Sequence, residues 1–309
     1  MTVCLKMKPV AGMAAACVLL AGCGGSGDNS FGGNPLPGQP TQNQSLDNLA
    51  VSQTFQTTSG TIVGDLAVGT GAPLSFNTAQ SGFGSQVELQ YNASNDSYTV
   101  RINQGGLSRT ETFRPSDIDA ALSDQTFTAY ARGDQLLGLL TPNNPITPLS
   151  FVGYGAWQDV RDQGSSVRFE TAFFTYGIRT AANDIPVTGP ITYNGIVDGF
   201  WNPGDGLRVL GGTVSFTADF PNDRINGTFD MVGESITSTN IRPFGIFDAV
   251  GTISSGQNEF SGTLQNRVSA TNTGFFDGAF FGPDAVEIGG TFRLTGFGQA
   301  VGVFVGSSN

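Results

Sequence analysis

The chain has 309 residues, a formal net charge of −11 at pH 7 and a mean hydropathy near zero. It contains no histidine, which excludes a His–carboxylate–Ser triad, His-ligated zinc and His-ligated haem. An acidic chain cannot neutralise many phosphates, so we predict no nucleic-acid partner. Without a catalytic motif or a cluster of metal-ligating side chains, we also predict no cofactor and no enzymatic activity.

Residues 1–22 have the organisation of a signal peptide. Lys6 and Lys8 form a short positive segment, and residues 10–20 form an apolar segment that is too short to span a bilayer. Residues 20–23, Leu-Ala-Gly-Cys, match a bacterial lipobox. We therefore predict that Cys23 is lipidated, with palmitate-type acyl chains, and becomes the first residue of the mature protein.

Residues 23–48 are predicted to form the lipidated cysteine and a disordered tether, because they are rich in Gly, Ser, Asn, Gln and Pro. Cleavage at the lipobox leaves Cys23 as the single cysteine, so no disulfide is expected. It also removes both lysines, which leaves 12 arginines, 25 acidic residues and a net charge of −13. The acidity favours solubility, and attraction of a basic partner is the alternative.

The remainder predicts an all-β fold with two parts: a β-rich domain over residues 49–184, here called the handle, and a barrel over residues 185–309. Residues 213–220 and 224–231 each alternate apolar and polar side chains, as in a strand with one buried face. In the handle, residues 87–91 and 98–102 predict a hairpin. Ser116–Leu122 is the single predicted helix.

The barrel region repeats the unit apolar-x-Gly-x-apolar five times. A glycine that shares a face with two apolar residues leaves room for a sharp bend or for a large ring against the backbone. About eight segments lie between Ile191 and Val305, so we predict an eight-stranded antiparallel up-and-down barrel filled by its own side chains. A lipocalin-like cavity is the alternative. The five glycines are Gly195, Gly227, Gly262, Gly278 and Gly290.

Three segments resemble transferrin-binding-protein-B-like surface lipoproteins. The run from Gly274 to Phe292, with its aromatic-Gly-Pro-x-Ala-x-Glu-x-Gly-Gly-x-Phe pattern, is similar to the barrel signature of that family. Residues 186–195 resemble the entry to the barrel, and residues 151–157 resemble a strand of the preceding domain. The resemblance implies one lobe, in which a handle packs beside an eight-stranded barrel.

The resemblance also implies a solute-binding protein of the outer membrane, lipid-anchored and surface-exposed, that acts in iron, haem or solute acquisition. Its expected partners are a host iron- or haem-carrying protein and a TonB-dependent transporter. Gly24 favours the outer membrane, by the same resemblance. The alternative is a structural or shielding lipoprotein without a transport role.

Two sets of residues are candidate functional residues. The first is the family motif, for which a structural role is favoured over a ligand site, with Glu287 accepting hydrogen bonds from neighbouring N–H groups. It consists of Gly282, Pro283, Ala285, Glu287, Gly289, Gly290 and Phe292. The second is an apolar stretch at 136–148, predicted to be an exposed binding loop. Its candidate residues are Leu139, Leu140, Asn143 and Asn144.

Overall fold

The computed structural model describes residues 42–254 and 258–308, and the signal peptide, Cys23 and most of the predicted tether lie outside them. The described chain is all-β, as predicted, with 16 strands and four short 3₁₀ helices. No helix in this part is long and apolar enough to cross a membrane.

Eight strands of the handle form one antiparallel sheet in the order β4-β3-β2-β1-β8-β7-β6-β5. The strands are β1 Gln53–Ala67, β2 Pro73–Asn92, β3 Ser97–Gln104, β4 Leu107–Phe113, β5 Phe127–Arg132, β6 Gln135–Leu140, β7 Val152–Asp162 and β8 Ser166–Gly177. The predicted hairpin is confirmed, because Leu89 pairs with Val100. The sheet curls until its edge strands approach one another, where Phe113 and Tyr130 pack edge to face.

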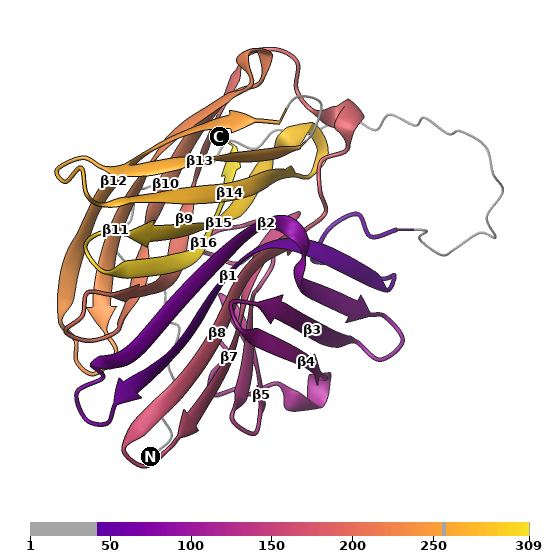
Figure 1. Cartoon of the computed structure of the whole chain (residues 1–309). Helices are drawn as coiled ribbons and strands as arrows, with labels where there is room; N and C mark the ends of the chain where they lie inside the picture. The colour runs from indigo at the N-terminus through magenta and orange to yellow at the C-terminus, as the bar shows by residue number, and fades with distance from the viewer. Residues whose placement is uncertain (1–41, 255–257, 309) are drawn as a thin grey trace.

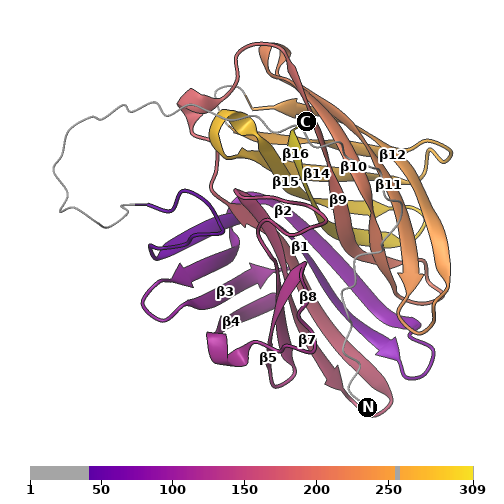
Figure 2. The same ribbon diagram turned by 180° about the vertical axis from the view of Figure 1, so that it is seen from behind.

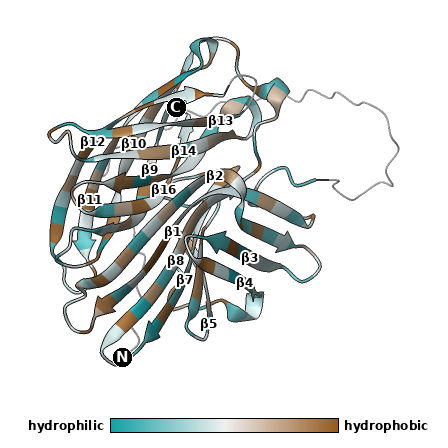
Figure 3. Cartoon of the chain, in the orientation of Figure 1, coloured by the Kyte–Doolittle hydropathy of each residue, from teal (hydrophilic) through white to brown (hydrophobic). Residues whose placement is uncertain are grey.

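The second set of strands forms a closed barrel in which each strand pairs with its neighbours in sequence, and β16 returns to pair with β9. These strands are β9 Pro190–Asn202, β10 Arg208–Asp219, β11 Arg224–Ser235, β12 Ile241–Ile253, β13 Glu259–Asn266, β14 Thr273–Phe281, β15 Glu287–Thr295 and β16 Gln299–Ser308. The predicted up-and-down barrel is therefore confirmed. Apolar and polar residues alternate along its strands (Figure 3).

The barrel interior is filled by aromatic rings. Phe216 lies 5.3 Å from Phe304, 5.5 Å from Phe276 and 5.6 Å from Phe229, between ring centroids. Each of these side chains is 0% exposed. The expectation of a core filled by side chains is confirmed: aromatic rings, rather than a lipocalin-like cavity, occupy the described interior of the barrel.

The sheet packs across the outside of the barrel, with β1 and β2 alongside β15 and β16 (Figure 1). Strands β11 and β12 lie on the side of the barrel remote from the sheet, as the reverse view also shows (Figure 2). The contact between the two parts is a continuous apolar cluster that includes Phe173 of β8 and Phe200 of β9, whose rings are 5.5 Å apart.

The helix predicted at Ser116–Leu122 is wrong. The segment holds one 3₁₀ turn, η1 (Pro115–Asp117), and then bends so that Ile118 bridges Tyr130 of β5. The Asp119 amide donates to the Ala129 carbonyl at 2.9 Å, and the Asp119 carboxylate accepts from the amides of Ala121 and Leu122. A local Asx turn and pairing with the sheet therefore replace the expected cap.

Candidate functional site

The family motif lies where the barrel meets the handle. Gly282, with φ +75°, leads from β14 into η4 (Pro283–Ala285), and Glu287 begins β15. Ala285 has φ +56° and is fully buried, and its carbonyl accepts a hydrogen bond from the Tyr193 hydroxyl at 2.7 Å. Side chains of the barrel thus hold this connection in a backbone conformation that alanine rarely adopts.

Glu287 joins the barrel to the handle. Its Oε1 accepts from the Ser150 amide at 2.7 Å, and its Oε2 accepts from the amides of Phe151 and Val152, both at 2.8 Å. Burial raises the pKa of Glu287, and the three amide hydrogen bonds oppose that shift. The side chain is 5% exposed, so these contacts exclude a ligand from its carboxylate.

The two glycines of the motif lie on opposite faces of β15, and each leaves room for a neighbouring side chain. A Cβ on Gly289 would lie 2.7 Å from Cγ2 of Val152 in the handle, and a Cβ on Gly290 would lie 2.5 Å from the Phe304 ring inside the barrel. Phe292 points into the same interior, 5.6 Å from Phe229. Gly289, Gly290 and Phe292 are buried and make the contacts that a structural role requires, whereas Pro283 of η4 is exposed.

The stretch at 136–148 differs from the predicted exposed apolar loop. Leu139 and Leu140 lie in β6 and are 4% and 1% exposed, so the expectation that they are exposed is wrong. Asn144 is buried and its side chain bonds the backbone of Thr141, Ile146 and Thr147, which shapes the turn. Asn143 is exposed and donates to Asp47 at 3.0 Å. Ligand binding by these residues stays a prediction.

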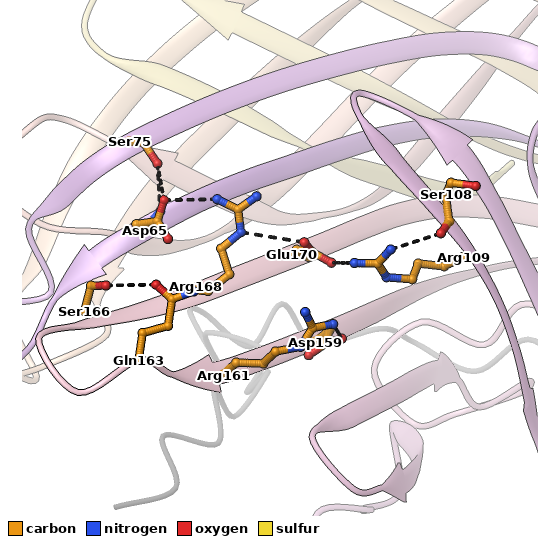
Figure 4. A network of polar contacts seen from close by, with 10 residues as sticks. All are labelled: Asp65, Ser75, Ser108, Arg109, Asp159, Arg161, Gln163, Ser166, Arg168 and Glu170. Atoms are coloured by element: carbon orange, nitrogen blue, oxygen red, sulfur yellow. Dashed lines mark hydrogen bonds and ion pairs between the residues drawn. The ribbon is translucent and has the colours of Figure 1, made fainter.

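Charged side chains of the handle form the network shown in Figure 4. Arg168 bonds Asp65 at 3.0 Å and lies 3.6 Å from Glu170, which accepts from Arg109 at 2.6 Å. Asp159, directly opposite Glu170 in the sheet, pairs with Arg161. Three carboxylates meet three guanidinium groups, so the network is neutral and pins the β3–β4 hairpin over β8.

The described residues contain no group of three or more His, Cys, Asp or Glu side chains that could hold a metal ion. Sequence reasoning also missed the polar contacts between sheet and barrel. The Tyr154 hydroxyl donates to Asp198 at 3.0 Å, and Gln80 donates to Asp277 at 3.0 Å. These partners are 44 and 197 residues apart, and no local pattern signals such pairs.

Comparison with known proteins identifies relatives of the barrel. Residues 185–308 match the family model described as C-lobe and N-lobe beta barrels of Tf-binding protein B. Transferrin-binding protein B from two strains of Haemophilus influenzae is 25% and 27% identical over 170 residues, covering 48% of this chain. The alignments cover 25% and 26% of those proteins, so the chain matches about a quarter of their length.

Solved structures of related proteins are also similar. Transferrin binding protein B of Neisseria meningitidis has a TM-score of 0.42 and 11% identity, over 84% of this chain and 77% of that one. The haemoglobin receptor HpuA of Kingella denitrificans has a TM-score of 0.41 and 15% identity, over 87% and 89%. The family match over residues 185–308 confirms the predicted resemblance of the barrel to the barrels of transferrin-binding protein B.

Proposed function

We propose that this protein is a lipid-anchored outer-membrane protein that binds a host iron-carrying protein through its outer surface. The match of residues 185–308 to a family named for transferrin binding is the observation that carries the proposal. A family of binding proteins also accords with the absence of a catalytic grouping in the sequence. The expected transporter partner is a TonB-dependent channel, which would take up the released iron or haem.

The packing of the barrel favours a protein ligand over a free small molecule. Its interior is occupied by phenylalanine rings, so binding there would require the core to open. All six tyrosines are buried or partly buried, and burial raises the pKa of each hydroxyl. A tyrosine ligand to haem iron must be deprotonated, and these environments oppose that. Both observations favour recognition at the outer surface.

The lipid anchor is the first part of the proposal to test. Cells expressing the full chain are grown with labelled palmitate, and the purified protein is examined for label. Incorporation that disappears in Cys23→Ser supports the anchor. Equal labelling of the variant would contradict it.

Ligand capture is tested on intact cells. Cells that display the full chain are incubated with fluorescent holo-transferrin, holo-haemoglobin or serum albumin, and bound fluorescence is measured by flow cytometry. Binding of transferrin or haemoglobin above albumin, lost in Cys23→Ser cells, supports an iron-acquisition role. If no iron carrier binds although antibody detects the protein on the surface, the structural or shielding alternative is favoured.

A further inference from the structure

One end of the barrel is closed by aromatic and arginine side chains, which we call the barrel mouth: Trp201, Arg208, Arg242, Phe244 and Phe297. The β9–β10, β11–β12, β13–β14 and β15–β16 turns surround it. The Trp201 ring lies 4.5 Å from Phe244 and 5.8 Å from Phe297. Phe297 is 55% exposed, whereas Trp201 is fully buried. The mouth thus presents one exposed ring, that of Phe297, beside buried aromatic rings.

Arg208 is a buried cation without a carboxylate partner. It is 7% exposed, and it makes none of the ion pairs found in the described chain. Its Nη1 donates at 3.2–3.4 Å to oxygens of Gly233 and Asn240, and its buried Nε has no acceptor. A buried charge is costly unless it is paired and hydrogen-bonded. The surroundings of Arg208 therefore suit an added anion.

Arg242 places a second guanidinium beside the Trp201 ring. Its Cζ lies 6.0 Å from the centre of the Trp201 ring, and that of Arg208 lies 5.9 Å from it. Arg242 bonds Asp205 at 2.9 Å, but the two side chains are 39% and 54% exposed. Exposed ion pairs contribute little stability. A carboxylate from outside can therefore replace Asp205 at low cost.

We propose that the barrel mouth binds an acidic side chain of a protein partner, with its carboxylate on the exposed Arg242 and with the buried Arg208 adding positive charge beneath the mouth. An apolar neighbour of that acidic residue packs on Phe297, which is 55% exposed. Guanidinium groups form strong bidentate bonds with carboxylates, and Arg and aromatic residues are frequent at binding hot spots. The inference rests on the proposed function and names the partner's chemistry.

The test measures binding of two short peptides to the full chain purified in a mild detergent. The probes are acetyl-Leu-Glu-Leu-amide and acetyl-Leu-Gln-Leu-amide, and the signal is the fluorescence of Trp201 in a Trp157→Phe background. The Glu peptide should bind about tenfold more tightly than the Gln peptide, as expected for one charge-assisted contact. Equal affinities would overturn the proposal.

Three surface variants separate recognition from structure. Arg242→Gln should weaken Glu-peptide binding about tenfold, and Asp205→Asn should tighten it, because the internal competitor is removed. Arg267→Gln is the matched control, since Arg267 lies in the β13–β14 turn but contacts strands rather than the mouth residues: it forms an exposed ion pair with Asp248 of β12 at 2.8 Å and bonds Thr228 of β11. If Arg242→Gln and Arg267→Gln bind the peptide equally, the mouth is not the site. If Arg242 had only a structural role, Asp205→Asn would not tighten the binding of the Glu peptide.

Whole-cell capture distinguishes this inference from the proposed function. If iron carriers bind wild-type cells and Arg242→Gln cells equally, the proposed function is supported and the mouth is excluded as the recognition surface. If no iron carrier binds but the Glu peptide binds in an Arg242-dependent manner, the mouth stands and its partner belongs to another class of protein.

Discussion

At the scale of single residues, Glu287 shows how one side chain can join two parts of a molecule. Its carboxylate receives three consecutive backbone amides from residues 150–152, at the start of β7. These amides come where the chain enters β7, and the buried carboxylate satisfies them. The hydrogen bonds of these three amides therefore depend on Glu287, which lies 135 to 137 positions later in the chain.

Glu287→Gln should lower the free energy of unfolding by about 2–4 kcal/mol, because one carboxylate oxygen becomes an NH₂ group that faces N–H donors. Chemical denaturation followed by circular dichroism measures the loss. Glu88→Gln is the control, since Glu88 lies 3.8 Å from an exposed Arg101 and should change stability by less than about 0.5 kcal/mol. Equal effects of the two substitutions would contradict the role of Glu287.

Asp198 should make stability depend on pH. Burial between sheet and barrel raises the pKa of Asp198 to about 6 from an ordinary 3.8, although hydrogen bonds from Tyr154 and the Gly199 amide oppose the shift. The folded protein then holds a proton that the unfolded chain has released between these pH values. This contribution to the free energy of unfolding is therefore largest below pH 3.8, falls as pH rises to 6, and is constant above it.

Asp198→Asn should remove that decrease and should be more stable than the wild type at pH 7, by at most about 3 kcal/mol. Asp198 is half-buried as a residue, so screening by water makes the gain smaller than this limit. Denaturation from pH 4 to 7 gives the difference between the two proteins. Parallel curves for wild type and variant would show that Asp198 titrates normally in the folded state.

At the scale of strands, the sequence predicted the barrel well because its signals are local. Alternation defines the two faces of β10 and β11, and the repeated glycines mark the inward face of the barrel. Their partners were not predictable: Gly262 pairs with Gly251, and Gly290 pairs with Gly278, across strands. Such pairs bring backbones together under rings like those of Phe276 and Phe304, and only the closed barrel reveals them.

The handle was predicted less well because tertiary contacts override its local signals. The capping residues at 116–119 favoured a helix, but Ile118 pairs with Tyr130 of β5 instead. The leucines at 136–140 resembled a loop beside two prolines, although curling of the sheet buries them in β6. The barrel mouth was hardest to predict, because Arg208 of β10, Arg242 of β12 and Phe297 of the β15–β16 turn come together around Trp201 of β9 only when the barrel closes.

Gly290→Ala should destabilise the protein by about 1–3 kcal/mol, because its Cβ would clash with the backbone carbonyl of Asp277 in β14 and would lie 2.5 Å from the buried Phe304 ring. Gly82→Ala in β2 is the matched control, since its Cβ would meet nothing nearer than Asp277 at 3.5 Å. Thermal unfolding of both variants checks the prediction. A shift in Tm that is as large for Gly82→Ala as for Gly290→Ala would show that steric contact inside the barrel is not the cause.

At the scale of the whole molecule, the sheet and the barrel share a core. One apolar cluster contains Ile62, Tyr154 and Phe173 from the sheet together with Phe200 and Val301 from the barrel. The sheet therefore loses part of its buried surface if the barrel unfolds, and the barrel loses part of its own if the sheet unfolds. Such shared burial couples the stability of the two parts.

We accordingly expect the handle and the barrel to unfold together. The described chain has one tryptophan in each, Trp157 in β7 and Trp201 in β9. Trp201→Phe leaves a reporter in the handle, and Trp157→Phe leaves one in the barrel. Because mutation can shift stability, each variant's fluorescence midpoint in guanidinium chloride is compared with the midpoint of the same variant by circular dichroism. Coincidence in both variants supports one cooperative unit, whereas a handle signal that changes before the circular dichroism would show that the shared cluster is too weak to couple them.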